Sequence, residues 1–472
     1  MKRFKENSLK SNKKIVQPNT VELSTINSHC AGIDIGSRSH FVSIPPELNK
    51  ETVREFSSTT AGVLKMCSWL KENNIVSAAM ESTGSYWIPV CEILEAHGIE
   101  GYLVDAKAVK HVPGRKTDVI DCQWIQKLHS HGLLPKAFRP KEYCLKLRAL
   151  TRQHTSLTEH RSPHIQHMQK ALHEMNIQLA THVRDITGVT GRRIIDAILN
   201  GERNMEAFAL LVDRRCKKSP KEIAESLKGN YRGEHLFTLR QARDLYDYYC
   251  QLIRECETEI EKALNELSQR KVNLQSIDNS EEVYEKKNAA QPTESKANKK
   301  TRFDFPVNTL LETISGVDIV QMPGIDQITA LKFLAEIGGN VDAWKGSKNF
   351  SSWMGLCPGN KTSGGRNLSG KTKRCANRCA NLLRMAANGL WNAKCYLGAF
   401  LRRMKGRLGG AKAITATAHK MAVILYTMIK EGKSYVELGE EYYERVYRER
   451  RLRGLERQAQ DMGFMLVQVN EN

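Results

Sequence analysis

The sequence predicts an α/β domain at the N-terminal end of the chain and a mostly helical remainder. Between residues 30 and 131 the hydrophobic pattern changes period in the order β, β, β, α, β, α, β, α. From residue 132 to about 270 apolar residues recur every three or four positions, which indicates helices. A polar stretch, 271–304, then precedes a second helical part. We therefore expect a mixed sheet with helices on both faces, followed by two helical regions.

Short apolar runs and turn residues predict each element of the α/β domain. The first two runs are separated by Gly, Ser and Arg, which indicates two strands joined by a tight turn. Thr117 is placed to cap the last helix. The expected strands are 30–35, 40–44, 52–56, 76–80 and 101–104, and the expected helices are 61–70, 86–97 and 117–131. This order of elements is that of an RNase H-like domain.

Length and charge bound the class of protein. The chain has 472 residues, too many for one hydrophobic core, and a formal net charge of +20. The excess is concentrated, because residues 343–430 contain 17 Lys and Arg and neither Asp nor Glu. Solvated surfaces usually mix both signs. This segment therefore indicates a surface that lies against a polyanion such as nucleic acid.

Targeting and cysteine patterns predict a cytoplasmic protein with no membrane partner. The first 17 residues are basic and polar, unlike a signal peptide, and no apolar run reaches the length of a membrane span. The 12 cysteines are scattered, so we expect reduced thiols. Cys375, Cys379 and Cys395 raise the alternative of a zinc site. No second ligand pair has the usual spacing, which favours core cysteines.

Composition divides the chain into six expected segments. The basic, polar N-terminus is typical of a disordered arm, and the polar stretch after the helical middle is typical of a flexible linker. The expected segments are 1–29 (arm), 30–140 (α/β catalytic domain), 141–270 (helical or coiled-coil region), 271–304 (linker), 305–432 (C-terminal domain) and 433–472 (C-terminal helix and tail).

Four acidic residues occupy positions at which an RNase H-like domain could hold metal. Asp34 lies in the first strand and Glu81 ends the fourth, and these strands are neighbours in that fold. Asp118 and Asp121 start the last helix three residues apart, hence on one face. Converging carboxylates repel one another unless hard cations such as Mg²⁺ bind them. Two such ions would clamp the attacking and leaving oxygens of a phosphodiester.

Each of these acids also has an alternative explanation. Asp34 lies in a Gly-x-Asp-x-Gly turn of the kind that cradles nucleotide phosphates in sugar kinases and chaperone ATPases, and it could also simply cap a turn. Asp118 and Asp121, taken singly, are ordinary charges at a helix N-terminus. The metal site is favoured for the set of four together.

The helical middle leaves several interpretations open. His160, His164 and His167 share one helical face, either as a metal cluster or, more in keeping with the pattern, as interior or DNA-facing side chains. Ser162-Pro163 fits the start of a helix, so we expect a break there. A seam with steps of three and four predicts a coiled coil suited to dimerisation, or a seam buried within one chain. Its residues are Leu245, Tyr249, Leu252, Cys256, Ile260 and Leu264.

Two segments of the C-terminal part suit phosphate binding. Residues 320–331 have the pattern of a helix, a Pro-Gly hairpin and a helix, which can offer backbone N–H groups to phosphates without reading bases. Residues 355–371 are glycine-rich, basic and hydroxyl-bearing. A loop that places a Ser among cations can bring an alkoxide to a phosphate. It can equally only grip phosphates, and chemistry alone does not separate these roles.

The chain resembles the insertion sequence 110 family of transposases in two blocks. The motifs Gly32-Ile-Asp-Ile-Gly36, Met80-Glu-Ser-Thr-Gly84 and Arg115-Lys-Thr-Asp-Val-Ile-Asp-Cys-Gln-Trp124 resemble its DEDD motifs in order, the third most closely those of the 1111 subgroup. The second block resembles its C-terminal domain through Gly355-Leu-x-Pro358, Thr362-Ser-Gly-Gly365, Leu368-Ser-Gly370, Asn377-Arg378, Leu383-Arg-Met-Ala-Ala387 and Lys412–Lys420. Together the resemblance covers about residues 30–460.

This resemblance implies a transposase or recombinase that joins two catalytic parts. In the RuvC-like domain Asp34, Glu81, Asp118 and Asp121 would bind one or two Mg²⁺ ions. In the C-terminal serine domain one Ser would attack DNA and form a phosphoserine link; the match falls on Ser363, with Ser369 as the less favoured candidate. The expected phosphate-binding residues are Lys361, Arg366, Lys371, Lys373, Arg374 and Arg378.

The resemblance also implies partners. It implies a prokaryotic, nucleoid-associated homodimer or homotetramer whose two domains meet in trans. It further implies a structured bridge RNA that selects target and donor DNA by base pairing, although the residues themselves indicate only affinity for polyanions. Two other functions remain as alternatives: a metal-dependent Holliday-junction-type nuclease without a covalent intermediate, and a catalytically idle nucleic-acid binder.

Overall fold

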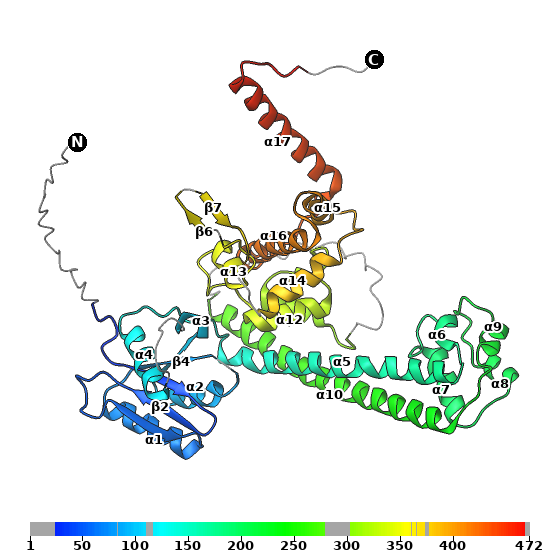
Figure 1. Ribbon diagram of the computed structural model, residues 1–472, viewed down its shortest axis with the longest axis horizontal. Helices are drawn as coiled ribbons and strands as arrows, with labels where there is room; N and C mark the ends of the chain where they lie inside the picture. The colour runs from blue at the N-terminus through cyan, green and yellow to red at the C-terminus, as the bar shows by residue number, and fades with distance from the viewer. Residues whose placement is uncertain are drawn as a thin grey trace, which may run out of the picture. The chain divides into compact units, whose positions relative to one another are not determined.

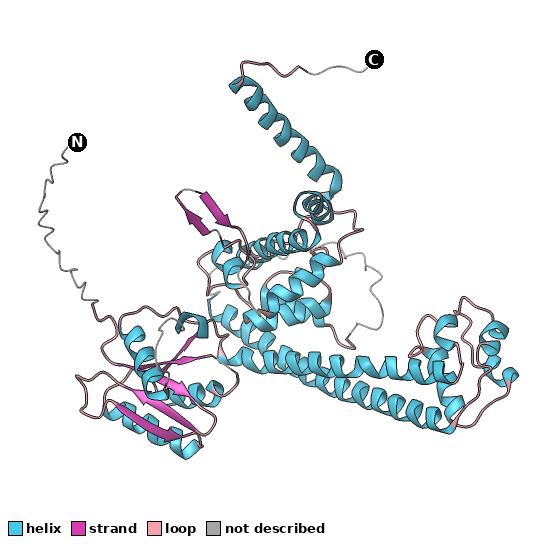
Figure 2. Ribbon diagram, in the orientation of Figure 1, coloured by secondary structure: helices cyan, strands magenta, loops and turns pink. Residues whose placement is uncertain are grey.

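The protein consists of two compact units, the first ending at Arg139 and the second beginning at Pro140. The computed structural model describes residues 24–82, 84–109, 117–278, 303–359, 361–364, 366–372 and 377–467. The first unit is α/β and the second is mostly helical (Figures 1 and 2). The predicted division into a mixed-sheet domain and a helical remainder is thereby confirmed.

A five-stranded mixed sheet forms the centre of the first unit. Its strands lie in the order β3-β2-β1-β4-β5. The first three are antiparallel neighbours, while β1, β4 and β5 run parallel. The bounds are β1 Cys30–Ile35, β2 Ser39–Ser43, β3 Val53–Ser57, β4 Ser77–Glu81 and β5 Glu100–Val104. Each predicted strand has its counterpart, and the arrangement is consistent with the RNase H-like expectation.

Helices cover both faces of this sheet. Alternate residues of a strand point to opposite faces, so Ile33 and Met80 pack with α1 (Thr60–Glu72) and α2 (Trp87–Ala96), while Ala79 packs with α4 (Asp118–Ser130). The short helix α3 is Ala106–Val109. Thr117 caps α4 as predicted, because its side chain accepts a hydrogen bond from the Ile120 N–H at 3.3 Å.

The N-terminal segment is attached to the end of α4. The backbone N–H groups of Ile26 and Asn27 both donate to the Ser130 carbonyl, at 2.8 and 2.9 Å. The prediction that the disordered arm extends to residue 29 is therefore wrong for Ile26 and Asn27, because they hydrogen-bond to a carbonyl at the C-terminal end of α4. The rest of the expected arm, residues 1–23, lies outside the described residues.

Two long helices, α5 (Glu142–Glu174) and α10 (Gly233–Asp278), pair in antiparallel fashion in the second unit (Figure 1). His154 Nε2 lies 3.1 Å from Glu257 Oε1, and nearer the other end His235 Nδ1 lies 3.2 Å from Glu174 Oε2. Four short helices close the far end around a core that includes Phe208. They are α6 Leu179–His182, α7 Val189–Leu199, α8 Met205–Leu210 and α9 Pro220–Glu225.

Helix α5 is continuous through Pro163, so the predicted break is wrong. Proline removes one helical hydrogen bond and usually kinks or breaks a helix. Here α5 packs along α10, and Tyr249 of α10 contacts the rings of both His160 and His164 on either side of the proline. Tertiary packing therefore outweighs the local preference.

The α10 seam is buried within one chain along its C-terminal half. Cys256, Ile260 and Leu264 are buried, and Cys256 Sγ donates to the Leu150 carbonyl of α5 at 3.4 Å. Leu245 in the other half is 45% exposed. These contacts favour the intrachain alternative for the buried half of the seam.

The linker expected from residue 271 cannot begin there. Helix α10 continues to Asp278, and Lys271 Nζ donates to the Ile314 carbonyl at 2.5 Å. Packing against the next helix therefore extends the ordered region. The remainder of the expected linker, 279–302, lies outside the described residues.

The C-terminal part contains helices and one small hairpin. The bounds are α11 Val307–Ser315, a 3₁₀ turn Ile319–Gln321, α12 Gln327–Ile337, α13 Ser347–Trp353, β6 Lys361–Ser363, β7 Arg366–Ser369, α14 Arg378–Asn388, α15 Tyr396–Leu408, α16 Gly410–Glu431 and α17 Gly439–Asp461. The predicted Pro-Gly hairpin precedes α12, with Gly324 at a φ of +87°. Tyr426 of α16 closes an aromatic core by donating to the Trp344 carbonyl at 3.0 Å.

Among the helices of the described ranges, none combines the length and the apolar character needed to cross a bilayer.

Replacing Gly32 by alanine should destabilise the first unit. A Cβ at this position would lie 2.3 Å from both the Cys122 carbonyl oxygen and the Gln126 nitrogen, which are backbone atoms of α4. Overpacking of this kind costs about 1–3 kcal/mol. Thermal unfolding of Gly32→Ala should show a lower midpoint for the first unit. Gly406→Ala is the control, because a Cβ there meets nothing within 4 Å; equal stability of the Gly32 variant and the wild type would refute the close packing.

Candidate active site

Strands β1 and β4 place Asp34 beside Glu81. Their parallel register pairs Gly32 with Ala79 and Ile33 with Met80, so the next step brings the two acids opposite each other. Neighbouring strands are about 4.8 Å apart. By alternation, both carboxylates share the sheet face of Gly32 and Ala79, the face that α4 covers. Both side chains are half-buried.

Helix α4 runs antiparallel to β1 and brings its first turn to the same edge. Asn27 Nδ2 donates to the His129 carbonyl at 2.8 Å, near the end of the helix, while Gly32 lies under Cys122. The C-terminal end of β1 therefore lies near the N-terminal end of α4. Asp118 and Asp121 occupy that first turn. Strand and helix together bring all four predicted acids to one edge of the sheet.

The Cys122 thiol reports the electrostatics of this edge. Burial raises its pKa to about 12, and the charge of Asp34 contributes next, with a further contribution from Asp121. Since Asp121 directly precedes Cys122 in the chain, the informative contribution is that of Asp34, which places the end of β1 near the first turns of α4.

The acids share an edge but do not form a closed ligand cage. Within the described residues, no group of three or more Asp, Glu, His or Cys side chains lies at metal-binding distances. Asp34, Glu81 and Asp121 each take part in other interactions. Their oxygens match the ligands that Mg²⁺ prefers, so the donor chemistry fits a divalent cation, while side-chain rotation is needed to bring the oxygens onto one ion.

Asp105 is a further acid at this edge that sequence reasoning did not single out. It follows directly after β5, the strand next to β4, and is exposed. The carboxyl ends of parallel strands meet at one edge of a sheet. Its position immediately after a predicted strand was the available signal.

The predicted serine loop forms an antiparallel hairpin of β6 and β7. Ser363 pairs with Arg366 across a turn in which Gly364 has a φ of +55°. The Ser363 side chain is exposed, whereas that of Ser369 is half-buried and its Oγ accepts the Lys371 N–H at 3.3 Å. The structure therefore presents Ser363 to solvent and uses Ser369 in a local turn.

The predicted phosphate-binding residues surround this hairpin in sequence. Arg366 and Lys371 are exposed, and Arg378 begins α14. Lys361 lies in β6. Lys373 and Arg374 lie outside the described residues. The hairpin belongs to the second unit and the acids to the first.

The alternative metal sites find no support in the described part of the chain. His164 stacks on Tyr249 with ring centroids 5.5 Å apart, and His160 lies 6.1 Å from the same ring. Cys379 and Cys395 are buried, as expected for core cysteines, and Cys375 lies outside the described residues. His164, Cys379 and Cys395 are therefore packing residues of the helical unit, whereas His160 is exposed.

Two family profiles match this chain. Residues 31–177 match a transposase profile of the IS110 DEDD type, and residues 310–396 match the profile described as Transposase IS116/IS110/IS902 family. The first match contains the acidic edge, and the second contains the serine hairpin. No curated protein matches the chain.

Proposed function

We propose that this protein, which carries two transposase domains of the IS110 type, is the recombinase of a mobile DNA element and works through a serine–DNA intermediate. The two profile matches support a transposase that acts on DNA. The observation that carries the finer proposal is the occurrence in one chain of an acidic sheet edge and an exposed serine on a basic hairpin. Neither the acidic edge nor the serine hairpin alone would favour a covalent serine–DNA intermediate over hydrolysis by water.

The acidic edge would hold one or two Mg²⁺ ions through Asp34, Glu81, Asp118 and Asp121. When bound, such ions supply charge stabilisation to a phosphate that undergoes displacement. The four residues come from two neighbouring strands and one helix start, so the sheet and α4 hold their backbones in place. Their charges would otherwise repel the phosphate.

Ser363 would act as the nucleophile. Its Oγ would attack the scissile phosphorus, one Oγ–P bond would form, the bond to the leaving deoxyribose oxygen would break, and the serine proton would end on that leaving oxygen as a hydroxyl group. One phosphoester replaces another, so the link retains the energy needed for rejoining. Arg366, opposite Ser363 in the hairpin, and the exposed Lys371 would neutralise phosphate charge.

The resemblance to the family supports three wider parts of the proposal. The protein would act as a homodimer or homotetramer in which one copy's hairpin serves another copy's acids. A structured bridge RNA would choose the DNA sites, and the basic stretch 343–430 offers positive charge for both nucleic acids. The protein would work at the nucleoid of a prokaryotic cell.

A covalent adduct tests the nucleophile. Incubation of the full-length protein with Mg²⁺, nicked DNA from the element's end and RNA transcribed from its flank should yield a protein-linked DNA strand. Ser363→Ala should abolish this adduct, because no other oxygen would occupy the attacking position, while Ser369→Ala should retain it. Denaturing gel electrophoresis with labelled DNA measures the product.

The same gel distinguishes the runner-up function. Cleavage that persists in Ser363→Ala with no linked strand would establish the junction nuclease, in which water attacks. An adduct that disappears only in Ser369→Ala would move the nucleophile to the second serine.

Neutralising the acids should stop the reaction. Asp34→Asn and Glu81→Gln each remove a charged metal ligand, and a loss of several kcal/mol of transition-state stabilisation lowers the rate at least ~100-fold. Strand-transfer rates in Mg²⁺ measure this effect. Glu100→Gln is the matched control, because Glu100 lies at the opposite end of β5 and pairs with Lys136. A full strand-transfer rate in Asp34→Asn would contradict the proposed role of Asp34, whereas DNA binding without strand transfer by the wild-type protein would leave only the idle nucleic-acid binder.

A further inference from the structure

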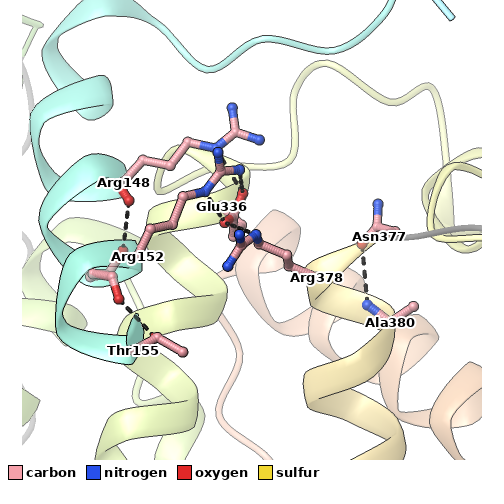
Figure 3. Close-up of polar contacts among 8 residues, drawn as sticks. Arg148, Arg152, Thr155, Glu336, Asn377, Arg378 and Ala380 are labelled. Carbon is pink, nitrogen blue, oxygen red and sulfur yellow. Dashed lines mark hydrogen bonds and ion pairs between the residues drawn. The ribbon is translucent and has the colours of Figure 1, made fainter. Parts of the chain in front are cut away.

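A buried carboxylate in the second unit gathers arginines from two distant segments (Figure 3). Glu336 of α12 is 7% exposed. Its Oε2 accepts from Arg148 Nε at 2.7 Å, and Arg152 donates through Nε to Oε1 and through Nη2 to Oε2, both at 2.8 Å. Arg378, the first residue of α14, approaches with its Nε 3.9 Å from Oε1. Helices α5, α12 and α14 thus meet at one side chain.

Positive charge exceeds negative charge at this point. Three guanidinium groups face one carboxylate whose two oxygens already accept three hydrogen bonds. The approach of Arg378 is an ion pair beyond hydrogen-bond length. Burial lowers the pKa of Lys332, one turn before Glu336; the charges of Glu159 and Asp326 oppose this effect, and Arg378 adds to it. The three arginines therefore outnumber the one carboxylate to which they are paired.

This surplus is costly in a partly buried site. Burial lowers the pKa of the Arg148 guanidinium; Glu336 opposes this effect, and neighbouring Arg152 adds to it. Burial alone would raise the pKa of Glu336, but Arg152 and Arg148 outweigh that effect, so the carboxylate stays charged. Glu336 compensates only one of the three positive charges. An anion from outside the chain would compensate the remaining charge and lower this cost.

The donors of the cluster remain available to such an anion. The side chains of Arg152 and Arg378 are 40% and 54% exposed. Figure 3 shows the terminal nitrogens of Arg148 directed away from Glu336, because its Nε makes the bond to the carboxylate. Guanidinium forks of this kind match the oxygens of a phosphate.

We propose that Glu336 is a positioning residue that orients Arg148, Arg152 and Arg378 to bind one phosphodiester group of the DNA backbone. Arg378 follows the serine hairpin by nine positions in the chain, and this stretch belongs to the acid-free basic segment. The assignment to DNA rests on the proposed function. The site itself contacts a phosphate and no reacting atom.

DNA binding measured against salt tests this site. The full-length protein carrying Ser363→Ala, which keeps the DNA uncut, is titrated with fluorescent duplex DNA at several salt concentrations. Adding Arg378→Gln should weaken binding about tenfold and reduce the salt slope by about one, because one phosphate contact is lost. Lys170→Gln is the control of equal charge change, since Lys170 is exposed on α5 and pairs only with Glu174 among the described residues.

Glu336→Gln gives the sharper readout. If DNA binds this surface only through its positive charge, removing the negative charge of Glu336 would tighten DNA binding. If Glu336 orients the arginines, removing that charge weakens DNA binding. If Arg378→Gln binds DNA as tightly as the control variant does, with an unchanged salt slope, the site is overturned. If circular dichroism shows that Glu336→Gln does not fold, the result for Arg378→Gln decides the test. Weakening seen with structured RNA but not with duplex DNA overturns the DNA assignment. If the protein with Ser363 intact forms no serine adduct while Arg378→Gln still weakens DNA binding, the proposed function is rejected and the site is retained.

Discussion

The direct contact of helix α4 with strand β1 decides the geometry of the acidic edge. The absence of a side chain at Gly32 lets the helix backbone approach the strand, where a Cβ would lie 2.3 Å from the Cys122 carbonyl oxygen. Because α4 runs antiparallel to β1, this contact sets which turn of the helix reaches the end of the strand. That turn carries Asp118 and Asp121, and the strand end carries Asp34. A shift of α4 by one turn would move its carboxylates by about 5.4 Å and separate them from the sheet.

The sequence predicted those parts of the fold that local patterns determine. The strands of the mixed sheet, the Thr117 cap and the position of Asp34 beside Glu81 follow from apolar runs, capping chemistry and the strand order of the expected fold. Pro163 shows the limit of such reasoning, because the partner helix α10 keeps α5 continuous. Long-range packing likewise attaches residues 26 and 27 to α4. The local sequence pattern predicts neither this attachment nor the pairing of α5 with α10.

The charged cluster was beyond sequence reasoning for a related reason. Glu336 stands between apolar residues of a helix, and its partners Arg148 and Arg152 lie 188 and 184 positions away. Their spacing of four on α5 is that of any solvated helix face. Only the packing of α5 against α12 turns two ordinary surface arginines into ligands of a buried carboxylate. Asp34, by contrast, could be recognised because a strand interior is an unusual place for a charge.

The two halves of the proposed chemistry have opposite electrostatic requirements. An acidic edge repels a phosphodiester, so affinity for DNA has to come from elsewhere, and the basic C-terminal segment can supply it. The proposed nucleophile Ser363 has the opposite requirement, because its activation needs an acidic group or a metal ion nearby. Residues 343–430 contain no carboxylate and a single histidine, His419, whose pKa is lowered by burial. In the proposed mechanism, activation of Ser363 by a carboxylate or by carboxylate-bound metal therefore requires acids from outside its own segment, and the acidic edge of another copy would supply them.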